Sequence, residues 1–559
     1  MKFTCRDGGI GRRPGLKILC QAIDVPVRFW FPAMASLFKG AFFLEIDMEF
    51  HSYSPVCPFK SIEDIKGKHI TVMGLGLNGG GEAAVKFFLK KGAFVLVTDM
   101  KTQEQLQPTI DRIHADSTID ISRLTYRLGE HRIEDFENAD CVIKNPGVKY
   151  EGNVYLAAAK AIETDLSIFL RFTDCPIIAV TGSKGKSSTV SAIYYGLSKA
   201  GYKTFLGGNI TVSPLTFFDE VSADTPVVIE FSSWQLADLR GRKVLKPHIS
   251  LITKIVPDHQ NWYGNMEDYV ADKRLIYADQ DSGDYSIFDE GGDEEGTAPD
   301  SALHPGIASW GDLFASESKA TVLRYNADKP RYDLGKLLVP GKHMQTNAQN
   351  AALVMQLMNV PKDKIVEILQ TWPGINHRLQ YFHSWKKTVK FSNNIEVSKS
   401  VGNVKKEIEY KFYNDTCATV PEAAAAATQA FEKPIILITG GTDKGLDLDK
   451  LVQALCGKLS FDVKQIYFLD GTATQKIIPM LNQRGVHYFG PFGSLVELLQ
   501  VLKTNLENQE DIDNADNLDL IEENDSEIIV FSPGATSFGM FANEFDRGNQ
   551  FMNAVKEIF

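Results

Sequence analysis

The sequence predicts an α/β protein of three domains, each built on a mainly parallel sheet. Length is the first reason, because 559 residues exceed what one hydrophobic core usually organises. The second reason is that short apolar runs repeatedly end in glycine-rich or polar loops, where parallel sheets bind ligands. The third is residues 177–188, where an apolar strand (177–180) and a glycine loop precede a helical pattern (186–199). That order is typical of a phosphate-binding unit.

The central glycine loop reads Gly-Ser-Lys-Gly-Lys-Ser from residue 182 onward. Gly182 and Gly185 would let the backbone approach an anion, which the loop N–H groups and the helix dipole would hold. Lys186 would reach the terminal phosphates of a nucleotide, and the Ser187 hydroxyl would bind Mg²⁺. The loop is one residue shorter than G-x-x-x-x-G-K-[ST], and the alternative is a plain turn with two solvated lysines. We predict a P-loop-type central ATPase domain over residues 176–375.

A second glycine loop lies in an N-terminal unit predicted to span residues 65–175. Residues 74–79 read Gly-Leu-Gly-Leu-Asn-Gly after an apolar strand (70–73), and Asp99 ends the next strand. Such a G-x-G-x-x-G unit, with an acid about twenty residues further on, is typical of a Rossmann-like domain. Alone it indicates only that a phosphate or a ribose could bind there, which leaves a nicotinamide-dependent dehydrogenase open. Asp99 could also be an ordinary surface carboxylate.

Two further side chains of the central unit suit metal binding. Glu230 stands near the carboxyl end of an apolar strand (227–231), where a nucleotide-bound Mg²⁺ needs a hard oxygen ligand. His259 follows Pro-Asp and could be a metal ligand or a plain loop histidine. Residues 282–300 are acidic and glycine-rich, which predicts a mobile surface loop.

The C-terminal unit is predicted to be a second Rossmann-like domain, over residues 376–559. Its apolar strands each end in a loop at which a parallel sheet could bind a ligand. These strands are 434–439, 465–469 and 527–531. Two polar stretches, 392–411 and 507–527, predict solvated insertions.

Composition excludes several classes of protein. The net charge of −12 argues against a nucleic-acid binder, although a local basic pocket for phosphates stays possible. Seven cysteines without C-x-x-C spacing indicate a reducing cytoplasm and no structural zinc. No apolar run approaches about 20 residues, so we expect no membrane-spanning helix and no membrane partner.

The first 64 residues form a doubtful leader, which we expect to be disordered or to reflect a misassigned start. Residues 6–18 resemble the conceptual translation of a transfer-RNA gene, and Met48 is a plausible true start. No secretory signal pattern is present.

Taken in order, the motifs resemble those of the Mur ligases from about Ile65 to Phe559. The matching stretches are Gly74-Leu-Gly76, residues 181–188, Gly207-Gly-Asn-Ile210, residues 230–236, Pro257-Asp-His259, Gly341-Lys-His343 with Asn347, Asn376-His-Arg378, Asn414-Asp415 and residues 532–547. The Glu-Phe-Ser-Ser-Trp-Gln-Leu stretch from Glu230 and the Ser-Pro-Gly-Ala-Thr-Ser-Phe stretch from Ser532 favour the D-glutamate-adding branch of the family.

The resemblance implies an ATP-dependent amide ligase of peptidoglycan precursor synthesis, acting in the cytoplasm as a monomer on small molecules only. It would join D-glutamate to UDP-N-acetylmuramoyl-L-alanine through an acyl phosphate, mostly by positioning and charge neutralisation. The implied cofactors are ATP, two Mg²⁺ ions and CO₂, which would form a carbamate on Lys273. A carbamate turns a cation into an anionic oxygen ligand.

The family's functional residues carry over onto matching positions. The catalytic set would be Lys186, Glu230, His259 and Lys273, and the metal ligands Ser187, Glu230, His259 and carbamylated Lys273. ATP would contact Gly182, Ser183, Lys184, Gly185, Lys186, Ser187, Ser188, Asn347, Arg378 and Asp415. The UDP-substrate would contact Leu75, Leu77, Asn78, Asp99, Asn209 and Ser232. D-Glutamate would contact Lys444, Ser537, Phe538 and Phe545.

Three residues depart from the family pattern. Lys254 stands where the family usually has Asn, Asn145 where it has Ser, and Cys417 where a Lys or another polar residue is common. The first could perturb the metal site, and the third removes a possible phosphate contact. The alternatives are a sibling ligase with another amino acid, such as a folylpolyglutamate-type enzyme, the dehydrogenase mentioned above, or a non-catalytic nucleotide-binding scaffold.

Overall fold

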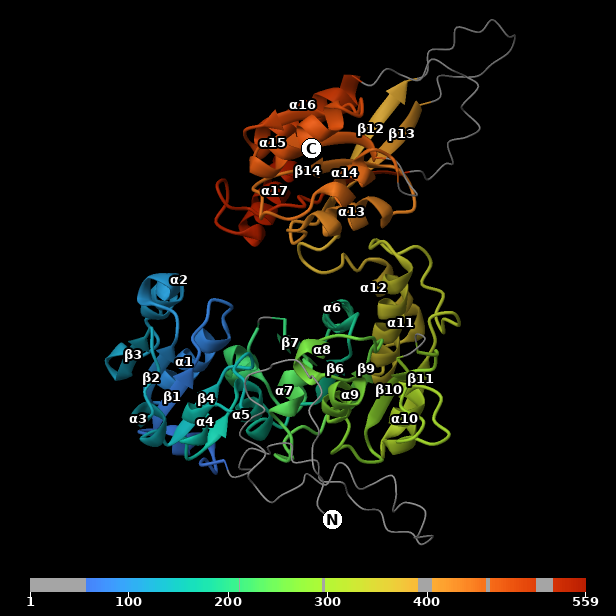
Figure 1. Ribbon diagram of the computed structural model, residues 1–559. Helices are drawn as coiled ribbons and strands as arrows, with labels where there is room; N and C mark the ends of the chain where they lie inside the picture. Colours follow the sequence, from blue (N-terminus) through green and yellow to red (C-terminus); the bar gives the residue numbers. More distant parts are fainter. Residues whose placement is uncertain (1–56, 211, 294–296, 391–404, 459–462, 509–525) are drawn as a thin grey trace, which may run out of the picture. The chain divides into compact units, whose positions relative to one another are not determined.

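The computed structural model describes residues 57–559, apart from residues 211, 294–296, 391–404, 459–462 and 509–525. The described residues form three sheets with helices between the strands (Figure 1). This confirms the predicted α/β class with three domains. Most of the predicted leader, including Met48, lies outside the described residues. Its last part does not, because Phe59 is buried and Ile62–Ile65 forms a short 3₁₀ helix. The domain boundaries stay predictions.

The first sheet is parallel throughout, with the strand order β3-β2-β1-β4-β5. Its strands are β1 His69–Met73, β2 Phe94–Asp99, β3 Leu124–Leu128, β4 Cys141–Lys144 and β5 Ile162–Glu163. Its helices are α1 Gly80–Lys90, α2 Gln103–His114, α3 Glu134–Glu137, α4 Val154–Ala157 and α5 Asp165–Arg171. The chain order reverses between β1 and β4, so the loops that follow these two strands meet where such sheets bind ligands.

The second sheet is also parallel, with the order β11-β10-β9-β6-β8-β7. Its strands are β6 Ile177–Thr181, β7 Phe205–Gly208, β8 Val227–Glu230, β9 Ile249–Ile252, β10 Tyr285–Asp289 and β11 Thr321–Tyr325. Its helices are α6 Lys186–Lys199, α7 Ser233–Ala237, α8 Gln260–Tyr263, α9 Met266–Arg274, α10 Trp310–Glu317, α11 Lys342–Leu357 and α12 Lys362–Gln370. A 3₁₀ helix covers Pro214–Glu220.

Helices α6 and α11 pack closely, because a Cβ built on Gly196 of α6 would lie 2.4 Å from the Met355 sulfur of α11. Buried aliphatic side chains of both helices join one core cluster with β6. This packing fixes the N-terminal half of α11, and therefore Asn347 in its second turn, beside the loop that precedes α6.

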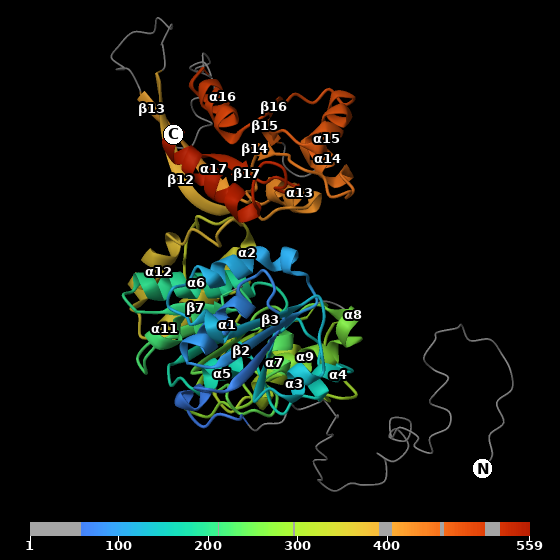
Figure 2. The same cartoon turned by 90° about the vertical axis from the view of Figure 1, so that its left-hand side faces the viewer.

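The third sheet has the order β12-β13-β17-β14-β15-β16, and only β12 and β13 pair antiparallel. Its strands are β12 Gln380–Lys390, β13 Lys405–Asn414, β14 Ile435–Thr439, β15 Val463–Leu469, β16 Phe489–Phe492 and β17 Ser526–Phe531. Its helices are α13 Pro421–Gln429, α14 Asp449–Leu455, α15 Thr472–Asn482, α16 Leu495–Asn508 and α17 Glu544–Ile558. Figure 2 shows β12 and β13 as a long curved pair.

Two predictions about loops are wrong. Residues 282–300 are not one mobile loop, because β10 lies inside them and pairs with β9 and β11. Residues 392–411 are not all insertion, because β13 already begins at Lys405. The remainder of that stretch, 392–404, and most of the acidic stretch 507–527 lie outside the described residues. Among the described helices, none is both long and apolar enough to cross a membrane.

Candidate functional site

The central glycine loop, residues 182–187, is called the phosphate loop below. It has the predicted order of strand, loop and helix. All five residues of β6 are buried, and α6 begins at Lys186 directly after Gly185. Gly182 has φ +140°, and a Cβ there would lie 2.0 Å from the Thr253 hydroxyl oxygen, so the position excludes any side chain. The Ser183 N–H donates to the Lys254 carbonyl at 2.9 Å, and its hydroxyl to the Val256 carbonyl at 2.8 Å. The loop is therefore fastened to the segment that leaves β9.

Two lysine ammonium groups converge on the same backbone carbonyl. Lys186 Nζ and Lys273 Nζ donate to the Gly182 carbonyl at 3.0 and 2.9 Å. Burial lowers the pKa of Lys273 well below its ordinary value, and the charge of Lys186 adds to that shift. Burial also lowers the pKa of Lys186, which the charges of Glu230 and Asp258 oppose. Burial and the Lys186 charge both shift Lys273, whose side chain is almost fully buried, toward the neutral amine.

Glu230 lies buried at the end of β8, with 1% of its surface exposed. The Asn209 amide donates to Oε1 at 2.7 Å. Oε2 is also buried, and no hydrogen-bond donor among the described residues reaches it. An unsatisfied buried carboxylate oxygen is costly, and it is the hard ligand that Mg²⁺ prefers. The Glu230 carboxylate therefore fits a cation.

His259 is the least enclosed member of the predicted catalytic set. It adopts φ +51° before α8, its side chain is 42% exposed, and Nε2 lies 3.9 Å from the Asp258 carboxylate. Its ring lies 4.8 Å from that of Trp234. In the part of the chain that is described, no three His, Cys, Asp or Glu side chains gather as a metal cluster. The candidate metal set therefore depends on Ser187 and on a modified Lys273 beside Glu230 and His259.

The remaining loop residues and Asn347 surround the same turn. Ser183 and Ser188 are buried, Ser187 is half-buried at the start of α6, and Lys184 is exposed. A Cβ built on Gly185, which has φ +91°, would lie 2.6 Å from Asn347 Oδ1. The same oxygen lies 3.4 Å from the Thr189 hydroxyl. Asn347 therefore touches the loop at the glycine where α6 starts.

The other two predicted ATP residues belong to the third sheet. Arg378 is exposed. Asp415 follows β13 and accepts hydrogen bonds from the Ser532 hydroxyl at 2.6 Å and from the Leu379 N–H at 3.1 Å. Burial nevertheless raises the pKa of Asp415 to about 6. This carboxylate holds the start of the β17 exit loop.

The predicted UDP-substrate residues lie around the first glycine loop, but they do not all present side chains. Leu75 is buried, whereas Leu77 and Asn78 are exposed. Asp99 is 7% exposed and accepts from the Gly76 N–H at 3.1 Å and the Lys101 N–H at 2.9 Å. Asp99 is thus not a surface carboxylate, and in this structure it orders the glycine loop.

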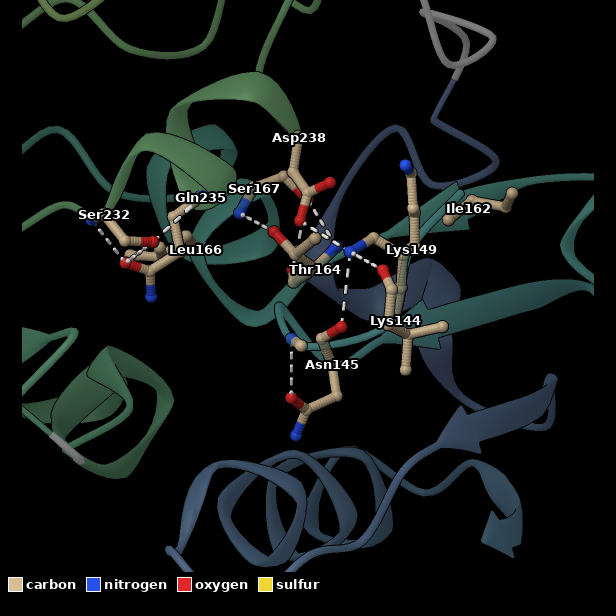
Figure 3. A network of polar contacts seen from close by, with 12 residues as sticks. Lys144, Asn145, Lys149, Ile162, Thr164, Leu166, Ser167, Ser232, Gln235 and Asp238 are labelled. Atoms are coloured by element: carbon tan, nitrogen blue, oxygen red, sulfur yellow. Dashed lines mark hydrogen bonds and ion pairs between the residues drawn. The ribbon is translucent and has the colours of Figure 1, made fainter. Parts of the chain in front are cut away.

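Sequence reasoning missed a buried cation beside that loop. Lys144, 2% exposed, donates to the carbonyls of Asn145 at 3.2 Å and Val148 at 2.9 Å, and lies 2.9 Å from the Asp238 carboxylate (Figure 3). The feature of the sequence that could have indicated this buried cation is a lysine at the end of the otherwise apolar strand β4. Ser232 forms a capping box with Gln235 at the start of α7, the helix that Asp238 ends.

The predicted D-glutamate residues lie on the loops after β14 and β17 and at the start of α17. Ser537 is buried, and Phe538 and Phe545 are 65% and 50% exposed. Lys444 is exposed and donates to the Thr419 hydroxyl at 3.2 Å.

The three departures have local partners. Lys254 Nζ donates to the Gly292 carbonyl at 2.9 Å, and its own carbonyl accepts from the phosphate loop. The Asn145 amide reaches the Gly74 carbonyl at 3.4 Å, which links the loops after β4 and β1. The Cys417 N–H donates to the His377 carbonyl at 3.0 Å, and burial raises the pKa of its thiol.

Comparisons with known proteins agree with this architecture. Residues 180–355 match the family model of the Mur ligase middle domain, and residues 68–166 that of the Mur ligase MurD-like N-terminal domain. The UDP-N-acetylmuramoylalanine–D-glutamate ligase of Treponema pallidum (strain Nichols) is 36% identical, over 89% of this chain and 98% of that protein. The ligase of the same name from Roseiflexus sp. (strain RS-1) is 32% identical, over 88% and 99%.

Among solved structures, the UDP-N-acetylmuramate-alanine ligase MurC from Thermotoga maritima is 16% identical, with a TM-score of 0.46 over 88% of this chain and 99% of that one. The family models and the relatives above 30% identity lead to one conclusion. The chain belongs to the Mur ligase family.

Proposed function

We propose that this protein is the ATP-dependent ligase that adds D-glutamate to UDP-N-acetylmuramoyl-L-alanine in peptidoglycan precursor synthesis. Two relatives carrying that activity in their names align over nearly the whole described chain. The observation in the structure that carries the proposal is the phosphate loop, with Lys186 and Lys273 converging on Gly182. A dehydrogenase would leave both lysines and the third sheet without a role.

The phosphate loop supplies what phosphoryl transfer needs. The N-terminus of α6 and the Lys186 ammonium would hold the triphosphate, since anions bind at helix N-termini. Ser187 and Glu230 would hold one Mg²⁺ and His259 would help to hold a second, and the buried Glu230 Oε2 without a donor supports this assignment. Bound Mg²⁺ would neutralise phosphate charge and orient the terminal phosphate. Asn209 keeps the Glu230 carboxylate in place through its amide.

The chemistry would proceed in two steps. A substrate carboxylate oxygen attacks the γ-phosphorus of ATP, which releases ADP and gives an acyl phosphate. The amine of D-glutamate then attacks the acyl carbon, loses a proton, and displaces phosphate to form the amide. Positioning and charge neutralisation account for most of the acceleration in such transfers.

Lys273 would serve as a carbamate rather than as a cation. Its depressed pKa favours the free amine, which is the form that can attack CO₂; the nitrogen then loses a proton and a carbamate anion results. That anion would remove the repulsion between Lys273 and Lys186 and add an oxygen ligand beside Glu230.

The remaining assignments follow the same proposal. ATP would contact residues 182–188, Asn347, Arg378 and Asp415; the UDP-substrate would contact Leu75, Leu77, Asn78, Asp99, Asn209 and Ser232; and D-glutamate would contact Lys444, Ser537, Phe538 and Phe545. The enzyme would act in the cytoplasm as a monomer.

The test is phosphate release by the full chain with each substrate omitted in turn. Release should require ATP, UDP-N-acetylmuramoyl-L-alanine and D-glutamate together, and replacement of D-glutamate by L-alanine, L-lysine or meso-diaminopimelate should abolish it. Activity only when both the amino acid and the acceptor are exchanged would show a sibling ligase. Lys186→Met should abolish release, whereas Lys199→Met, at the far end of the same helix, should not. Equal activity of the two variants would contradict the proposal.

A further inference from the structure

The third sheet contains a buried arginine without an acidic partner. Arg547 of α17 is 0% exposed and is one of the largest fully buried side chains. Its two terminal nitrogens donate to the carbonyls of Ala535 at 3.0 Å and Thr416 at 2.9 Å. Among the described residues, no carboxylate lies within ion-pair distance, and Nε has no hydrogen-bond acceptor.

A buried arginine without an acidic partner lowers the stability of the folded state. Buried charges are normally paired with an opposite charge, because their desolvation is otherwise uncompensated. Burial lowers the pKa of Arg547 to about 10, and the charge of Glu544 opposes that shift. The guanidinium is therefore still a cation at neutral pH, and its presence calls for an explanation beyond packing.

The position of the guanidinium supplies that explanation. Thr416 lies just after β13, Ala535 just after β17, and Gly441, whose built Cβ would be 3.7 Å from Arg547 Nη1, just after β14. These three strands are consecutive neighbours in the sheet. One side chain therefore joins the β13 and β17 exit loops by hydrogen bonds and lies close to the β14 exit loop. The carboxyl ends of adjacent strands are where open parallel sheets bind ligands.

The loops that Arg547 connects are those that carry the proposed amino-acid site. Ser537 and Phe538 come two and three residues after Ala535, and the β14 and β17 loops also pair through Thr442 and Thr536. A change in the Ala535 carbonyl would thus move Ser537 and its neighbours together.

We propose that Arg547 is a positioning residue that makes this pocket selective for an acidic amino acid. Its two hydrogen bonds fix the β13 and β17 exit loops in one arrangement. Its unpaired charge, acting through a low-dielectric interior, favours a ligand with two carboxylates over a neutral analogue. This inference rests on the proposed function, because D-glutamate is the acidic ligand that the pocket would take.

The test compares Arg547→Met and Arg547→Lys with Arg484→Met, a matched control on an exposed arginine of the same domain. Loss of a positioning group should raise KM for D-glutamate on the order of 10- to 100-fold in Arg547→Met. KM for the UDP-substrate should stay unchanged, and KM for ATP should rise less than KM for D-glutamate, because the Thr416 carbonyl that Arg547 holds follows Asp415 of the proposed ATP set. Arg547→Lys should fall between Arg547→Met and wild type, because it keeps the charge but not the two-pronged donor. Arg484→Met should match wild type.

Selectivity gives a readout that a purely structural role would not move. The wild type should prefer D-glutamate over D-glutamine strongly, and the ratio of kcat/KM values should shrink at least tenfold in Arg547→Met. Circular dichroism confirms folding; if Arg547→Met does not fold, the ratio in Arg547→Lys decides. An unchanged ratio in a folded variant, or equal rises in all three KM values, would overturn the inference. Absence of D-glutamate-dependent activity in the wild type would instead overturn the proposed function.

Discussion

Gly185→Ala is the sharpest perturbation of the phosphate loop. Gly185 has φ +91° immediately before α6, and a left-handed conformation costs an L-residue about 1–2 kcal/mol. The new Cβ would also lie 2.6 Å from Asn347 Oδ1, where ordinary contact begins at 3.4 Å, so the amide would have to retreat by the difference, 0.8 Å. The variant should therefore lose stability and displace a group that we assign to ATP binding.

Gly201→Ala is the matched control, because it separates these two effects. Gly201 follows the other end of α6 with φ +97°, and nothing lies within 4 Å of its built Cβ. Both variants should weaken hydrogen-exchange protection of α6 by about 1–2 kcal/mol. Only Gly185→Ala should raise KM for ATP, on the order of tenfold or more. An equal KM for ATP in the two variants would refute the assignment of this loop as the triphosphate site.

Three further predictions concern buried charges. Burial raises the pKa of Asp415 from 3.8 to about 6, so the folded state favours the protonated form. The free energy of unfolding should therefore fall as pH rises through that interval, by about 3 kcal/mol for roughly two pH units. Asp415→Asn should be the more stable protein at pH 7, and its stability measured by hydrogen exchange should lack this pH dependence. Activity of the wild type should fall in CO₂-depleted buffer and return with bicarbonate, whereas Lys273→Met should be inactive in both; a wild type indifferent to CO₂ would exclude the carbamate. Lys144→Met removes the cation 2.9 Å from Asp238 and should cost about 3–5 kcal/mol, seen as lost hydrogen-exchange protection in residues 141–148; unchanged protection there would show that the ion pair contributes nothing.

The phosphate loop and the strand ends could be predicted because their signals are local. A β-branched run, two glycines and a helical segment within residues 177–199 specify one turn, and Glu230 follows from the same logic at the neighbouring strand. Strand β10 of the second sheet was missed because Tyr285–Asp289 is short and lies between acidic, glycine-rich segments. β13 was misread because it opens with three charged residues and then alternates charged with apolar side chains up to Phe412, as a strand with one solvated face does.

The buried cations could not be predicted, because their partners are distant in sequence. Arg547 donates to Thr416, 131 positions away, and no local pattern connects the two. Lys144, in the first sheet, likewise pairs with a carboxylate that is distant in sequence. That carboxylate is Asp238, at the end of α7 beside the second sheet. Asp99 could be placed at its strand end, but its two backbone hydrogen bonds depend on how the glycine loop folds back.

The central claim is that ATP activates a substrate carboxylate at the phosphate loop, and isotope transfer tests it most directly. UDP-N-acetylmuramoyl-L-alanine labelled with ¹⁸O in its alanyl carboxylate would be turned over with ATP and D-glutamate, and the released phosphate analysed by mass spectrometry. An acyl phosphate requires one labelled oxygen to appear in each phosphate released. Phosphate free of label, released at the same rate as the amide forms, would contradict the account.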